Sequence, residues 1–246
     1  MRATGLIAVL ALLGSTHAVG ADRVPSHVDT AWVVTSDAEG HVVKLMQHTR
    51  YKAEVAKPLA KLIRSWTFEP GSINGQPQVT QTTLNVRLSV EPRGERYLTR
   101  VADVHTGPRV VRTAELRFPN SQLKPRDGHN YSALTVLRVK YNENGKVTAV
   151  SAAPGTPPGN DEVFMRVSMA SVKRWFFEPE RVGGHGVAGA VYLPIGYTLW
   201  HPSRSSAGAE CGSWQAPSRE RAVRGGEVLS ENPVARLKSE VVGSTP

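Results

Sequence analysis

The chain has 246 residues, of which 40% are hydrophobic and 21% are charged, and its formal net charge is +9. This length and balance are ordinary for a globular protein with one large domain or two small ones. Because the positive charge forms no cluster of arginines interleaved with aromatic residues, a nucleic-acid-binding protein is disfavoured, and the single cysteine, Cys211, excludes an internal disulfide.

The N-terminal residues have the layout of a secretory signal peptide. Arg2 precedes an apolar run over residues 5–13, and small residues then lead to Ala21, after which cleavage is expected. We therefore expect residues 1–21 to be a signal peptide and the mature chain to be exported, with no transmembrane segment. An uncleaved anchor is the alternative, although the apolar run is short for a bilayer.

Each half of the chain begins with a β-hairpin pattern. In the first half Trp32 and Val34 alternate with other residues, and a Gly-containing turn at 37–40 is followed by a strand at 42–47. In the second half the corresponding turn lies at 142–145 and the second strand at 146–152. The Pro/Gly-rich segment 153–160 then predicts a loop.

A short amphipathic helix follows each hairpin. The first helix is expected to carry Pro58 in its first turn and an inward stripe of Leu59, Leu62, Ile63 and Trp66. The second helix is expected to begin at an Asn160 N-cap and to turn inward Phe164, Val167, Ser171 and Trp175.

Both helices end in nearly the same heptapeptide, "RSWTFEP" at 64–70 and "KRWFFEP" at 173–179. Basic residues suit the last helical turn, and proline stops the helix. The repeat therefore predicts a structural corner between helix and strand, used twice. The repeated positions are Trp66, Phe68, Glu69 and Pro70 in the first copy and Trp175, Phe177, Glu178 and Pro179 in the second.

A turn and a last strand complete each copy, at 79–90 and at 188–199. The sequence therefore predicts an α+β protein of two tandem β-β-α-β units, each a helix packed on a small antiparallel sheet. We expect the first domain at 24–100, the second at 101–200, and a disordered tail at 201–246, which is rich in Ser, Gly and mixed charge.

The second copy resembles the C-terminal domain of TonB-type energy transducers. The resemblance rests on "VLRVKYNENGKVTAVSAAP", "VKRWFFEPERVGGHGV" and "VYLPIGYTL", with Phe118-Pro119 similar to the family's Tyr-Pro lead-in. The first copy is similar from Trp32 to Val90 but lacks that lead-in. Together the two regions, 28–91 and 109–200, cover most of the chain after residue 21.

The resemblance implies a periplasmic, non-catalytic binding module that offers an edge strand to a peptide. Its partner would be a protein or peptide, such as a TonB-dependent outer-membrane receptor, and self-association is a further expectation. The implied binding positions are Ala188, Ala190, Tyr192, Pro194 and Gly196 of the last strand, together with Phe118 and Pro119. The open alternative is that this strand supplies only core and edge-blocking residues.

The chain departs from the family in two respects. An energy transducer needs an inner-membrane anchor and a Pro-rich spacer, and neither is expected here before residue 28. The second unit is also an addition, and the first unit could pair with it. The runner-up hypothesis is therefore a periplasmic scaffold protein with self-paired units, whose basic surface contacts the cell wall or the membrane.

An enzyme is poorly supported by the sequence. No two histidines have the i, i+4 spacing of a helical metal pair, and no Gly-x-Ser-x-Gly or P-loop motif occurs. The "GHGVAG" stretch at 184–189 is preceded by a helix and followed by a strand, which predicts a turn and no dinucleotide site. Glu69 and Glu178 lack a partner acid or base. We therefore expect no catalytic residue, cofactor or metal.

Overall fold

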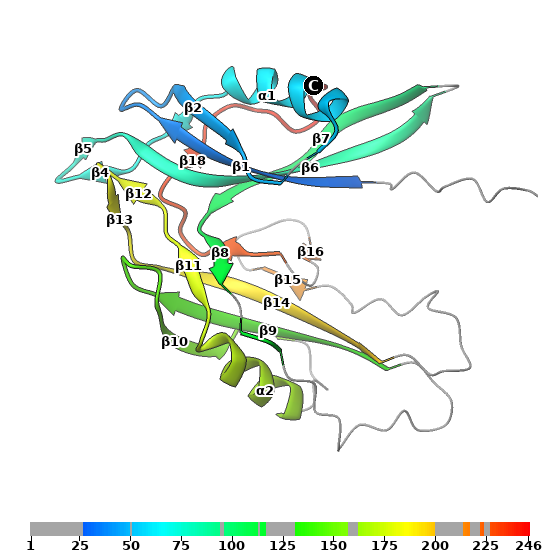
Figure 1. Cartoon of the computed structure of the whole chain (residues 1–246), viewed down its shortest axis with the longest axis vertical. Coiled ribbons are helices and arrows are strands. Elements are labelled where there is room, and N and C mark those ends of the chain that lie inside the picture. The colour runs from blue at the N-terminus through cyan, green and yellow to red at the C-terminus, as the bar shows by residue number, and fades with distance from the viewer. Residues whose placement is uncertain are drawn as a thin grey trace, which may run out of the picture.

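The computed structural model describes residues 27–49, 51–93, 96–112, 114–116, 131–156, 162–199, 214–216, 222–223 and 227–246. Two antiparallel sheets face each other, and each carries one helix on its outer side (Figure 1). The C-terminal segment begins between the sheets and ends beside α1, on the outer side of the first sheet. The expected signal peptide, Asn160, Cys211, Phe118 and Pro119 lie outside the described residues.

The first sheet has the order β13-β12-β6-β1-β2, and β7 also pairs with β6. Its strands are β1 (His27–Ser36), β2 (Val42–Gln47), β6 (Thr80–Arg93), β7 (Arg96–Gly107), β12 (Arg181–Val182) and β13 (His185–Gly186). The second sheet has the order β10-β9-β14-β17. Its strands are β9 (Tyr131–Tyr141), β10 (Val147–Ala152), β14 (Gly189–Leu199) and β17 (Leu229–Ser230).

The remaining elements are two helices and four short strand pairs. The helices are α1 (Ala53–Arg64) and α2 (Glu162–Val172). The pairs are β3 (Phe68–Glu69) with β18 (Arg236–Leu237), β4 (Ser72–Ile73) with β5 (Gln76–Pro77), β8 (Arg109–Arg112) with β11 (Phe176–Glu178), and β15 (Trp214–Gln215) with β16 (Ala222–Val223).

The predicted fold class is wrong. The described residues are mostly β, with 54% in strands and 14% in helices, and they include a curled antiparallel half-barrel sheet. The two halves are also not separate β-β-α-β units, because β12 lies between α2 and β14 in sequence yet pairs with β6 of the first sheet. The prediction failed because strand pairing between distant segments leaves little trace in local periodicity.

The first core lies between α1 and the first sheet. Leu59, Ile63 and Trp66 are buried there as expected, and they pack with Phe68 and residues of β1 and β6. Pro58 lies in the interior of α1 and not in its first turn, because the helix begins five residues earlier, at Ala53. The apolar stripe was thus predicted correctly, while the start of the helix was not.

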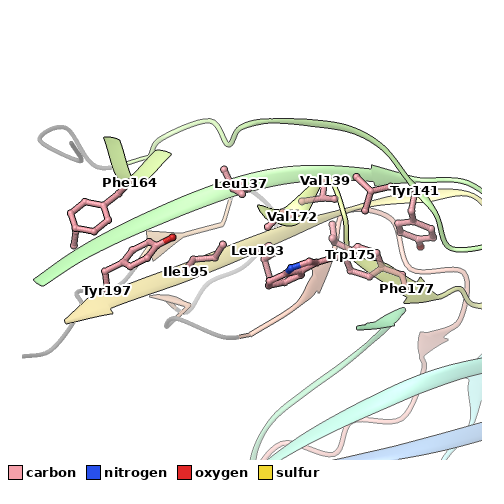
Figure 2. Close-up of a cluster of buried hydrophobic side chains, with 13 residues drawn as sticks. Leu137, Val139, Tyr141, Phe164, Val172, Trp175, Phe177, Leu193, Ile195 and Tyr197 are labelled. Carbon is pink, nitrogen blue, oxygen red and sulfur yellow. The ribbon is translucent and has the colours of Figure 1, made fainter. Parts of the chain in front are cut away.

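The second core lies between α2 and one face of β9 and β14 (Figure 2). Phe164, Ser171 and Trp175 are buried as predicted, whereas Val167 is only half-buried. The hydroxyl of Ser168 faces the second sheet instead, 2.6 Å from that of Tyr197. Ser168 is a polar residue on the buried face of α2, so a search for apolar periodicity did not find it.

The repeated heptapeptide forms the same corner in both halves. The N–H of Phe68 donates to the carbonyl of Gly40 at 2.9 Å, and that of Phe177 donates to Gly145 at 2.8 Å. Each aromatic residue thus joins its strand to the hairpin turn of its own half. Both glycines have positive φ, +91° and +80°, and a Cβ there would lie within 1.9 Å of the phenylalanine carbonyl oxygen. The repeat therefore encodes a main-chain junction.

The C-terminal segment 227–246, which we name the strap, is ordered against both sheets, contrary to the expected disorder. Leu237 lies opposite Phe68 in the β18–β3 pair, and Val241 is buried in the first core. The pair mirrors β8–β11, where Val110 lies opposite Phe177. β18 of the strap therefore pairs with the corner strand of the first half in the same way that β8 pairs with the corner strand of the second half. Local composition does not reveal this long-range pairing.

Candidate interaction edge on β14

The predicted binding strand, β14, pairs along its whole length with β9 on one side. On its other side, the outer edge, it pairs with β17 only at Val191 and Tyr192. The N–H of Glu231 donates to the carbonyl of Ala190 at 2.9 Å, which extends this contact by one position. Among the described residues, Pro194 and Gly196 therefore have no ladder partner on the outer edge.

The register determines which main-chain groups face this outer edge. In an antiparallel strand, successive residues direct their N–H and C=O groups to opposite neighbours. Because the carbonyl of Ala190 accepts from the strap, the even-numbered residues of β14 face the outer edge and the odd-numbered ones face β9. Pro194 is an even position, so the donor that proline lacks is missing from the outer edge. Proline occurs in strands at such edge positions.

The even-numbered residues proposed for partner binding differ in exposure. Ala188 precedes β14 and is exposed, Ala190 is half-buried, and Gly196 is exposed. Tyr192 and Pro194 are buried. Their side chains share one face of the sheet, opposite the face covered by α2, because every second residue of a strand points the same way.

This second face of the sheet carries a small apolar cluster, which we name the edge cluster. Leu229 of β17 packs there against Tyr192, and the ring centroid of Tyr192 lies 5.2 Å from that of Trp214. The indole N–H of Trp214 donates to the carbonyl of Pro154 at 3.2 Å. The other buried members are Leu134, Val136, Ala153 and Ala216. The outer edge is thus a main-chain ladder flanked by an apolar side-chain site.

An ion pair adjoins the edge cluster. Arg138 of β9 donates to the carboxylate of Glu231 at 2.6 Å, and the hydroxyl of Tyr192 donates to the same carboxylate at 3.1 Å. The hydrogen bonds from Arg138 hold the pKa of Glu231 below its usual value, while burial raises the pKa of Tyr192. The side chains of β17 and its flank are therefore bound at two points, one apolar and one ionic.

A second carboxylate, that of Glu180, lies between the sheets and is only 2% exposed. It accepts hydrogen bonds from the Thr82 hydroxyl at 2.7 Å and from the N–H of Val234 at 3.0 Å. Burial raises its pKa, although these hydrogen bonds oppose that effect. Glu180 directly follows the repeated heptapeptide, and no local sequence signal marks its burial.

A polar cleft of about 480 Å³ opens between β1, β7, β8 and the strap. Arg87 in this cleft donates to Asp29 at 2.6 Å and to Glu227 at 2.7 Å. Arg109 donates to Glu178 and to a ring nitrogen of His48 at 3.0 Å. Both arginines are held by carboxylates, so an anionic ligand would bind here only by replacing one of these carboxylates.

The other predicted motif residues take structural positions. Trp66, Phe68, Trp175 and Phe177 are buried in the two cores, while Pro70 and Pro179 follow the corners. Glu69 is exposed, and Glu178 is held by Arg109. The 184–189 stretch forms the turn into β13 and the start of β14. None of these residues converges on another in a catalytic arrangement within the described part of the chain.

Comparisons with protein-family models, with curated proteins and with solved structures give no match to this chain. The resemblance to TonB C-terminal domains therefore rests on the sequence motifs alone. In the described ranges no three His, Cys, Asp or Glu side chains are grouped so that they could hold a metal ion. Neither α1 nor α2 has the length and apolar character of a membrane-spanning helix.

Proposed function

We propose that this chain is a non-catalytic protein-interaction module that binds an extended peptide or partner strand by strand addition at the outer edge of β14. The main support is that this edge carries only a short resident strand, β17, while Pro194 and Gly196 have no ladder partner on it among the described residues. Strand addition uses such an edge, with main-chain hydrogen bonds giving affinity and alternate side chains giving selectivity.

The chemistry of the edge is consistent with a selective site. Gly196 directs its N–H outward and adds no side chain that would obstruct an incoming strand. Pro194 offers only its carbonyl, which limits promiscuous edge-to-edge pairing. The edge cluster beside Tyr192 supplies an apolar subsite, and Arg138 supplies a cation. An incoming strand would therefore be read by its side chains as well as by its backbone.

The sequence resemblance supports a partner connected with TonB-dependent transport, such as an outer-membrane receptor. The signal-peptide pattern of residues 1–21 supports a periplasmic location. The partner, the periplasmic location and the non-catalytic role are all parts of the proposal.

Hydrogen exchange on the full mature chain tests strand addition directly. We would add candidate receptor peptides and follow individual amides by NMR. A partner strand should protect the outward N–H of Gly196, whereas Ile195 and Tyr197, whose amides face β9, serve as internal controls. Protection confined to other elements, or no peptide-dependent protection at all, would overturn the proposal.

A second candidate is a periplasmic scaffold protein with self-paired halves. It is favoured by the ladder between β12 and β6, where Arg181 lies opposite Gln81 and Val182 opposite Thr80, and by the strap. The basic net charge would then contact the cell wall or an anionic membrane. Salt-sensitive cosedimentation with purified cell wall or anionic vesicles, without any protection of Gly196 by peptides, would favour this candidate.

A further inference from the structure

We propose that the strap segment 227–231 is an intramolecular ligand that blocks the outer edge of β14, and that its sequence gives the chemistry of the external partner. That partner is an extended peptide with two acidic residues flanking an aliphatic one at alternate positions. This inference rests on the proposed function, because it concerns the same edge.

The pattern follows from the register of β17. Leu229 lies opposite Tyr192, so its side chain lies on the same face of the sheet as Tyr192 and enters the edge cluster. Glu227 and Glu231 lie two positions away on either side, and in an extended strand they point the same way. Glu231 is bound by Arg138, and Glu227 is bound by Arg87. The binding elements are thus an aliphatic pocket between two guanidinium groups.

The backbone contact of this segment is short compared with that of its neighbours. β17 contributes a two-residue ladder, whereas β9 pairs with eleven residues of β14. A peptide of similar chemistry that also paired with Gly196 would gain main-chain contacts that β17 does not make. Such a peptide could displace the strap from this edge.

The rest of the strap is held independently of β17. Glu180 accepts from the N–H of Val234, β18 pairs with β3, and Val241 is buried in the first core. The segment 227–231 could therefore leave the edge while residues 234–246 stay in place. Between the two lie Asn232 and Pro233, which form no regular element and suit a hinge.

Displacement of a resident strand makes a quantitative prediction. The apparent affinity for an external peptide equals its intrinsic affinity multiplied by the fraction of molecules in which the edge is free. Glu231→Gln removes the charge bound by Arg138 and so weakens the resident strand without changing the edge itself. Since a charge-assisted hydrogen bond is lost, we expect the external peptide to bind about tenfold more tightly to this variant.

The experiment uses a fluorescent peptide with the sequence of residues 226–233, GEVLSENP, titrated into the full mature chain by anisotropy. The chain is tested as wild type, Glu231→Gln, Glu231→Ala and Glu240→Ala, an exposed strap residue that serves as the matched control. Circular dichroism confirms folding, and Glu231→Gln is retained if the alanine variant unfolds. We expect tighter binding for both Glu231 variants and wild-type binding for Glu240→Ala.

Two further variants locate the contact. Arg138→Ala in the chain, or Glu→Gln at the peptide position equivalent to 231, should abolish the gain in affinity. If the peptide binds wild type and both Glu231 variants equally, autoinhibition is overturned while strand addition stands. If receptor peptides protect Gly196 but GEVLSENP binds no variant, the assignment of partner chemistry is overturned. If no peptide of either kind binds any variant, both proposals fall.

Discussion

The hydroxyl of Thr82 donates a 2.7 Å hydrogen bond to the carboxylate of Glu180, which lies 98 residues further along the chain. The same carboxylate accepts from two consecutive backbone N–H groups of the strap, those of Val234 and Ala235. One buried acid thereby joins the first sheet, the second half and the C-terminal segment. Its protonation state should influence how firmly these three parts hold together.

The pH dependence of stability should carry the signature of Glu180. Burial raises its pKa above the ordinary value of 4.5. A carboxyl group with a higher pKa in the folded than in the unfolded state contributes most stability below the unfolded pKa, and this contribution is lost as the pH rises through the folded pKa. As the pH rises from 4.5, wild type should therefore lose stability relative to Glu180→Gln. Urea unfolding of both proteins across this range measures the difference, and a constant difference would contradict the prediction.

A buried hydroxyl without a partner predicts a stabilising substitution. The side-chain oxygen of Thr135 on β9 is fully buried and has no hydrogen-bond partner among the described residues. Thr135→Val keeps the shape and removes the desolvated hydroxyl, so the free energy of unfolding should rise by about 1 kcal/mol. Thr82→Val is the matched control, because it removes the donor to Glu180 and should lower stability by about 1–3 kcal/mol. Equal effects of the two substitutions on the urea midpoint would refute this argument.

Two adjacent valines in the strap allow the contribution of core packing to stability to be measured, because only one of them is buried. Val241 is 5% exposed and lies in the first core, whereas Val242 is 70% exposed. Val241→Ala should lower the free energy of unfolding by roughly 1–2.5 kcal/mol through lost packing. Val242→Ala should change it by less than about 0.5 kcal/mol. Chemical denaturation measures both changes. If Val241→Ala left the free energy of unfolding unchanged, the strap would not belong to the first core in solution.

The glycine of the first hairpin turn should be intolerant of a side chain. Gly40 has φ +91°, and a Cβ would lie 1.9 Å from the carbonyl oxygen of Phe68. Gly75 has a similar φ of +77° but no atom within 4 Å of the added Cβ. Gly75→Ala should thus lower the free energy of unfolding only by the cost of placing alanine in a left-handed backbone conformation, roughly 1–2 kcal/mol. Gly40→Ala adds the clash and should cost on the order of 3–4 kcal/mol. Thermal unfolding of the two variants gives the comparison; similar costs would rule out the close approach.

Pro194 should limit edge-to-edge pairing of β14 with a strand of another molecule. Pro194→Ala restores an outward N–H two positions beyond Tyr192, and an edge with a complete set of donors pairs more readily with another strand. We expect the variant to self-associate at lower concentration than wild type in sedimentation velocity experiments. Ala190→Ser, on the same edge, leaves the backbone donors unchanged and should behave as wild type. A purely monomeric Pro194→Ala would show that this edge is protected by other means.

Sequence patterns predicted what is local in this protein. The hairpins appear as β1–β2 and β9–β10, the apolar stripe of α1 faces the core, and the heptapeptide forms a repeated corner. These features depend on residues within a few positions of one another, where periodicity and turn chemistry operate. The edge position of Pro194 also has a readable signal, since proline is excluded from the middle of a sheet.

The fold class and the strap were mispredicted because both depend on distant pairings. Residues 236–237 complete a ladder with 68–69, and 181–182 join a strand of the other half. Two-residue strands carry no periodicity, and a Ser- and Glu-containing segment such as 227–246 has the composition of a disordered tail until its few apolar residues find their cores. Leu229 and Val241 are such residues. The number of residues between Leu229 and Val241 matches the positions of the two sheets against which they pack.

The pairing of β18 with β3 also bears on the order in which the protein acquires its structure. During synthesis the segment that ends at Glu69 emerges long before Arg236 and Leu237, its eventual neighbours. The N-terminal half therefore cannot complete its hydrophobic interior until the strap, which supplies Leu237 and Val241, has been synthesised. Contacts of such high sequence separation slow folding and leave partly built strands exposed. An intermediate that lacks the strap, residues 227–246, should bind holdase chaperones.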